Sequence, residues 1–109
     1  MTPGRNKWSP ADASRHLNAM AADPLLNLSL TLHARERLSE RGLIMADVLH
    51  VLGTGFVYED PEPASRPDLW RYKIEGLSPN SHGRHVRVVV IPGPGPSFKI
   101  VTVMWKDER

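Results

Sequence analysis

The fold is decided by residues 85–105, which read HVRVVVIPGPGPSFKIVTVMW. Two runs rich in β-branched residues, 85–91 and 98–105, flank a segment in which Pro and Gly alternate. Such runs favour strands, and alternating Pro and Gly cannot form regular structure. Because so short a connection joins antiparallel neighbours, the pattern predicts two paired strands. The second run is apolar on both sides, which favours a central position in the sheet.

Two further strands are predicted upstream, at about 56–59 and 69–75, bounded by turn-forming segments. Side chains alternate along each strand, so Arg71 and Lys73 are expected on one face together with His85 and Arg87. The opposite face of the sheet is then free to pack on helices. These features predict a four-stranded antiparallel sheet.

Helical signals fill the first half of the chain, at about 10–21, 31–41 and 46–52. The first helix has a Ser-Pro start, and the second ends before a Gly typical of a helix C-terminus. Buried positions are expected at Leu30, Ala34, Leu38, Val48, Leu52, Val88 and Val101. The fold class is therefore α+β, with three N-terminal helices packed on the sheet. Residues 1–8 are expected to be a flexible lead-in, and 9–109 a single domain.

Composition narrows the range of functions. The 109 residues, 40% of them hydrophobic, suit one modest core. The absence of cysteine excludes disulfides, thiolate catalysis and Cys-based zinc sites, and it suits the cytoplasm. The sequence has no apolar run long enough to span a membrane and no HExxH motif or phosphate-binding Gly-rich loop. We therefore expect no cofactor, no metal site and no membrane association.

Charge is mildly positive, with a formal net charge of +2. Between Arg66 and Arg87, five basic residues stand against two acids, and His82 and His85 lie in the same stretch. Such a basic surface is compatible with nucleic acid. A solvated sheet face without a ligand is the alternative explanation.

The segment 32–42, LHARERLSERG, carries the strongest chemical signal. His33, Arg37 and Arg41 are spaced by four, so they follow one side of a helix, next to its apolar stripe. Histidine can transfer protons at neutral pH, and arginine can clamp a phosphate with two hydrogen bonds. The structural alternative is equally open: Arg37 pairs with Glu40, His33 with Glu36, and Arg41 binds the last helix carbonyls.

Residues 31–43 read Thr-Leu-His-Ala-x-x-Arg-Leu-x-Glu-Arg-Gly-Leu, and a short helix and Val-rich strands follow them. This pattern resembles a family of short bacterial proteins of unknown function. That family is similar to RelE- and BrnT-type toxins, and the likeness covers about 28–105. The resemblance implies a RelE-like fold, ribonuclease activity, an antitoxin partner and roles for His33, Arg37 and Arg41. One departure is Met45, where a Ser or Thr would cap the third helix, and this leaves the start of that helix open. The N-terminal extension with its own helix is a second departure.

Two functions follow as hypotheses. The first is a toxin-type, metal-independent endoribonuclease in which His33 is the general acid or base and Arg37 and Arg41 bind the scissile phosphate. Its RNA surface would be lined by Tyr72, Lys73, His85 and Arg87. The second is a non-catalytic module that binds protein or nucleic acid, such as a phage- or plasmid-encoded inhibitor. A second proton-transfer group near His33 would separate the two, and His85 is the residue proposed for it.

Overall fold

The computed structural model describes residues 7–66 and 68–108, which form three helices and six strands. The elements run in the order α1 (Pro10–Ala21), β1 (Asn27–Leu30), α2 (Leu32–Glu40), α3 (Met45–Thr54), β2 (Phe56–Val57), β3 (Glu62–Pro63), β4 (Trp70–Gly76), β5 (Val86–Pro92) and β6 (Ser97–Trp105). The sheet has the strand order β1-β6-β5-β4-β2, and β3 pairs with β4. The α+β class is thus confirmed.

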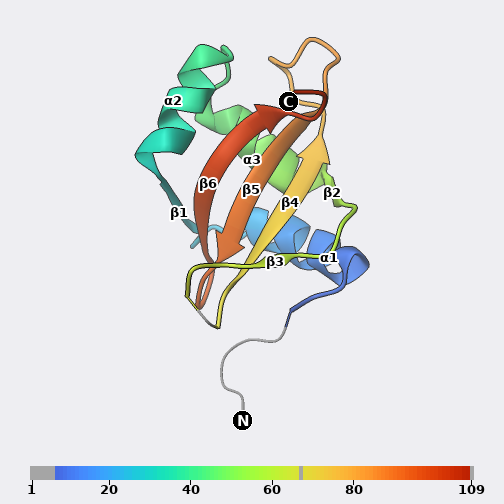
Figure 1. Cartoon of the computed structure of the whole chain (residues 1–109), viewed down its shortest axis with the longest axis vertical. Helices are drawn as coiled ribbons and strands as arrows, with labels where there is room; N and C mark the ends of the chain where they lie inside the picture. Colours follow the sequence, from blue (N-terminus) through green and yellow to red (C-terminus); the bar gives the residue numbers. More distant parts are fainter. Residues whose placement is uncertain (1–6, 67, 109) are drawn as a thin grey trace.

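The sheet has one covered face and one open face. Helices α1 and α3 lie behind the sheet and α2 packs beside β6, whereas the segment that carries β3 crosses the opposite side (Figure 1). We call this opposite side the open face. The core lies between the helices and the sheet and includes Leu17, Val48, Leu52, Ile74 and Val103, all fully buried.

The helix starts follow from local hydrogen bonds. Ser9 caps α1, where its hydroxyl accepts a bond from the Asp12 amide at 3.2 Å, and α1 has the predicted bounds. Thr31 caps α2 through the Ala34 amide, and its hydroxyl also donates to the Val101 carbonyl at 2.8 Å. One side chain therefore starts the helix and ties it to β6.

The sequence leaves the start of α3 open, because Met45 stands where a Ser or Thr would cap the helix. In the structure, Asp47 defines where α3 begins. Its carboxylate accepts a bond from the Ile44 amide at 2.9 Å, so Ile44 stands at the N-cap. The same carboxylate accepts bonds from the backbone and side-chain nitrogens of Asn80 in the β4–β5 loop. These bonds lower the pKa of Asp47 against the opposing effect of its burial, which is the largest single influence.

The prediction of four antiparallel strands is wrong in two respects. No strand was predicted between the first two helices, but β1 lies there and pairs with β6 in parallel, with Leu28 opposite Phe98. The two-residue β3 lies inside the proline-rich segment 61–67 and pairs with β4. Strands this short carry too few residues to show a period, so only their partners define them. The predicted central position of the last strand is confirmed, because β6 lies between β1 and β5.

The core prediction holds for Leu38, Val48, Leu52 and Val88, and fails in part for Val101. Val89 pairs with Thr102 and Val90 with Ile100, so Val101 is the extra residue of a β-bulge and stays partly exposed. Leu30 belongs to β1 rather than to the helix stripe and is only partly buried.

No helix in the described ranges 7–66 and 68–108 is both long and apolar enough to cross a membrane.

Candidate functional site

The three α2 residues predicted to act together have different environments. His33 is exposed in the first turn of the helix, and its ring makes no hydrogen bond within the described part of the chain. Arg41 follows the helix as its C-cap, about two turns from His33. The helix therefore holds the two residues apart along its length.

Arg37 and Arg41 are both engaged by carboxylates. Arg37 pairs with Glu40, as the structural alternative proposed. Arg41 donates from Nε to Glu108 at 2.9 Å, makes a second bond to the same carboxylate, and also reaches Glu40 and the Arg37 carbonyl. Its side chain is only 12% exposed, and the bond to Glu108 raises its pKa. Arg41 therefore ties the end of α2 to the C-terminal segment.

On the open face, the basic residues next to the segment that carries β3 are largely neutralised by ion pairs. Arg71 lies 3.5 Å from Glu62, and Lys73 lies 3.6 Å from Glu59 and 3.9 Å from Glu62. Both glutamates come from the segment that carries β3. Arg71, Lys73 and Arg87 share the open face as predicted, but this segment screens the first two.

A denser cluster of charged side chains surrounds a buried glutamate at the end of the open face where β4 ends and β5 begins. The Glu75 side chain is 3% exposed, and its Oε2 accepts bonds from Arg87 Nε at 2.9 Å and from the same guanidinium at 2.8 Å. Its Oε1 lies 3.2 Å from Lys106 Nζ but receives no hydrogen bond of normal geometry. We call Glu75, Arg87 and Lys106 the Glu75 cluster. A buried carboxylate between two cations occurs both in functional sites and in structural ion-pair networks.

His85 adjoins the Glu75 cluster. Its carbonyl accepts a bond from the Lys106 amide at 2.9 Å, and the two residues line a cleft of about 390 Å³ with Gly83, Arg84 and Asp107. His85 directly precedes β5 and stands two residues before Arg87, so the alternation of the strand, continued by one residue, places both on the open face. An exposed imidazole, a guanidinium and an ammonium therefore lie at the same end of the sheet.

Aromatic rings border this cleft. Lys106 Nζ lies 5.2 Å from the centre of the Tyr58 ring, and the Arg84 guanidinium lies 4.2 Å from that of Trp105. Arg84 also pairs with Asp107 at 2.9 Å, which lowers the pKa of that carboxyl. Each of the two cations therefore lies over an aromatic ring as well as pairing with a carboxylate.

Tyr72 does not lie on the open face, and its assignment to an RNA surface is corrected. The side chain is 1% exposed on the helix-facing side of β4, where its hydroxyl accepts a bond from the Trp8 amide at 2.8 Å. The ring also packs 5.5 Å from that of Trp8. Strand alternation already separated Tyr72 from Arg71 and Lys73, and the structure follows that alternation.

Sequence reasoning missed Glu75 and Lys106. The alternation placed Glu75 beside Arg71 and Lys73, but only the β4–β5 register puts it opposite Arg87. The long turn between these strands hides that register from the sequence. Lys106 follows the last strand and reaches Glu75 only because β6 lies next to β5.

Residues 30–105 match a domain of unknown function, DUF4258. The chain belongs to the DUF4258 family. The DUF4258 match spans α2 through β6, so it contains His33, Glu75, His85 and Arg87, whereas α1 and the Lys106–Glu108 segment lie outside it. No curated protein and no solved structure matches the chain.

The chemistry open to this DUF4258 domain is proton transfer and anion binding. His85 and His33 are exposed imidazoles, and Arg87 and Lys106 can meet an anion. Within the described residues, no three His, Asp or Glu side chains gather into a group that could hold a metal ion.

Proposed function

We propose that this domain is a toxin-type, metal-independent endoribonuclease that cleaves RNA at the upper end of the open face. One observation carries the proposal: an exposed histidine borders a cleft whose neighbouring arginine and lysine are held by a buried glutamate. The sequence resembles a family that is similar to RelE- and BrnT-type toxins, and on that resemblance we extend the proposal to an antitoxin protein as partner.

The reaction requires only groups that the Glu75 cluster and the adjoining His85 offer. The 2′-hydroxyl of a nucleotide attacks its own 3′-phosphate, its proton passes to a base, and the 5′-oxygen of the next nucleotide leaves with a proton from an acid. His85 is the proposed proton-transfer group: as a base it takes the proton of the 2′-hydroxyl, and as the resulting imidazolium it gives that proton to the departing 5′-oxygen when the P–O5′ bond breaks. Arg87 and Lys106 would stabilise the charge that develops on the phosphate oxygens. Glu75 is a positioning residue, because it holds both cations from beneath.

The α2 residues remain a second placement of the same chemistry. His33 is exposed and free to act as acid or base, and the Arg37 side chain is partly exposed beside it. Arg41 has a supporting role in this proposal, since its guanidinium is held by Glu108. The two histidines come from different elements, so mutation can tell the two placements apart.

The test is cleavage of a defined RNA oligonucleotide by the purified protein in the presence of EDTA. We expect products with 2′,3′-cyclic phosphate ends. His85→Ala should lower the cleavage rate on the order of 10²-fold, the scale of general acid–base catalysis. His50→Ala is the matched control, because His50 is exposed on α3, away from the Glu75 cluster. A loss with His33→Ala and none with His85→Ala would assign the chemistry to α2.

A non-catalytic binding module is the second function we consider. Two neighbouring aromatic residues, Phe56 and Tyr58, are 57% and 60% exposed at the β2 edge of the sheet, with ring centres 6.3 Å apart. Exposed aromatic rings are typical of protein-binding surfaces. Absence of cleavage by the wild-type protein, with retained binding of a protein partner, would favour this function.

A further inference from the structure

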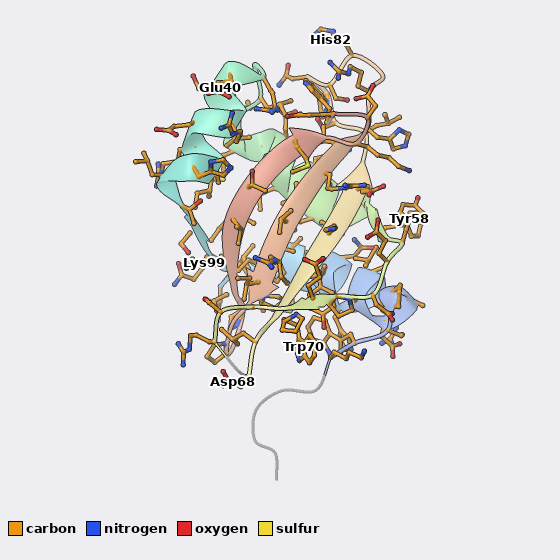
Figure 2. The ribbon with its side chains drawn as sticks, viewed as in Figure 1. Glu40, Tyr58, Asp68, Trp70, His82 and Lys99 are labelled. Carbon is orange, nitrogen blue, oxygen red and sulfur yellow. The ribbon has the colours of Figure 1, made fainter. Side chains whose placement is uncertain are left out.

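A second cleft lies at the other end of the open face, where β1, β5 and β6 meet the β3–β4 loop. Its volume is about 250 Å³, and it is lined by Asn27, Ser29, Arg66, Leu69, Ile91, Gly93, Pro94, Ser97, Phe98 and Lys99. Strand register explains how it forms, because Ser29 and Ile91 both stand opposite Lys99. In Figure 2, Lys99 and Tyr58 lie on opposite sides of the view. We call this second cleft the Lys99 cleft.

The charge of the Lys99 cleft differs from that of the rest of the open face. Arg71, Lys73, Arg87 and Lys106 each lie within 4 Å of a glutamate. Arg66 and Lys99, in contrast, form no ion pair within the described part of the chain, and no acidic residue lines the cleft. Two cations without a carboxylate create a local positive potential that an anion would satisfy.

Neutral donors complete the lining. The side chains of Ser29 and Asn27 are exposed on β1 and can each donate a hydrogen bond. The Ser97 hydroxyl is already used, since it donates to the Pro94 carbonyl at 3.0 Å. Ile91 and Leu69 add an apolar wall. The cleft is smaller than the ~300–1,000 Å³ typical of pockets for drug-sized ligands, so it suits a compact anionic group.

We propose that the Lys99 cleft binds a phosphate group through Arg66 and Lys99, with Ser29 and Asn27 as additional donors. An arginine fork matches phosphate oxygens with two bonds, and a lysine adds a point charge. The phosphate can belong to a free phosphomonoester or to the backbone of a nucleic acid. The site does not depend on the proposed ribonuclease activity, because it lies at the other end of the sheet from His85.

The test is isothermal titration of the full chain with inorganic phosphate at constant ionic strength. We expect saturable binding that weakens about tenfold or more in Arg66→Gln and in Lys99→Gln, the scale of a lost bond to a charged group. Arg35→Gln is the matched control, since Arg35 is exposed on α2 and also has no ion pair in the described residues. All three cations are exposed, so the variants should fold, which circular dichroism will check.

Titration with two further ligands distinguishes a free phosphomonoester from a nucleic-acid backbone as the source of the phosphate. These ligands are a nucleoside 5′-monophosphate and a single-stranded oligonucleotide without terminal phosphates. Tighter binding of either one than of inorganic phosphate, lost in Lys99→Gln, supports the site and identifies its ligand. Equal weakening in Arg35→Gln, or no saturable phosphate binding, would overturn the proposal. His85→Ala should leave phosphate binding unchanged, so failure of ribonuclease activity and failure of this site can be told apart.

Discussion

At the scale of single residues, Glu75 is the most informative position in the domain. It pairs with two cations, and it is buried on the face that lacks helices. Burying a carboxylate without paired charges is costly. Arg87 and Lys106 supply them while keeping partial access to water.

Glu75→Gln should destabilise the protein, because it removes the negative charge between Arg87 and Lys106. We expect a loss of about 1–3 kcal/mol in the free energy of unfolding, below the range for fully buried pairs because both cations reach solvent. Urea denaturation measures it. Lys73→Gln is the control: its ion pairs are more exposed, and we expect a change within about 0.5–1 kcal/mol. Equal effects of the two substitutions would contradict the central role of Glu75.

At the scale of elements, the end of α3 packs tightly on β4 through two glycines. A Cβ at Gly55 would lie 2.5 Å from the Glu75 carbonyl oxygen and 2.6 Å from that of Val51. Gly76 lies against Gly55 in turn, because a Cβ at Gly76 would lie 3.2 Å from the Gly55 Cα. These contacts involve backbone atoms, which cannot rotate away as a side chain would.

Gly55→Ala should therefore lower the melting temperature, whereas Gly53→Ala should raise it slightly. A Cβ at Gly53 meets only the Ala21 methyl at 3.8 Å, an ordinary contact, and alanine favours the helix by about 1 kcal/mol. Thermal unfolding followed by circular dichroism compares the pair. A Gly55→Ala protein as stable as the wild type would show that α3 and β4 can move apart without cost.

The elements also show how far sequence reasoning reached. The first helix was predicted with correct bounds because Ser9 and Pro10 are local signals that act within one turn. β1 was missed because its four residues form a strand only through pairing with β6, some 70 residues later. The Glu75 cluster was missed for the same reason, since strand register joins its members. Helix starts set by neighbouring residues could therefore be predicted from the sequence, whereas the pairing of distant strands could not.

At the scale of the whole molecule, two arginines fasten the C-terminal segment. Arg41 comes from the end of α2 and binds Glu108, and Arg84 comes from the β4–β5 loop and binds Asp107. Glu108 also accepts a bond from the Trp105 amide at 2.9 Å. The segment after β6 thus joins the helical layer to the loop above the sheet.

The Arg41–Glu108 pair makes part of the stability depend on pH. The bond from Arg41 holds the pKa of Glu108 below its ordinary value of 4.5. A lowered carboxyl pKa gives stability that is present above the unfolded pKa and lost as pH falls through the folded one. Glu108→Gln should therefore be less stable than the wild type near pH 7, and the difference should shrink below about pH 4. Urea denaturation at both pH values tests this, and a constant difference would refute it.

The position of β6 has a consequence for synthesis. This strand follows every other element in the chain, yet it is the one between β1 and β5. A growing chain that has emerged only as far as β5 therefore has no partner for β1, and β5 presents an unpaired edge. The sheet can close only once residues 97–105 have left the ribosome, so until then the nascent sheet stays open and accessible to chaperones or proteases.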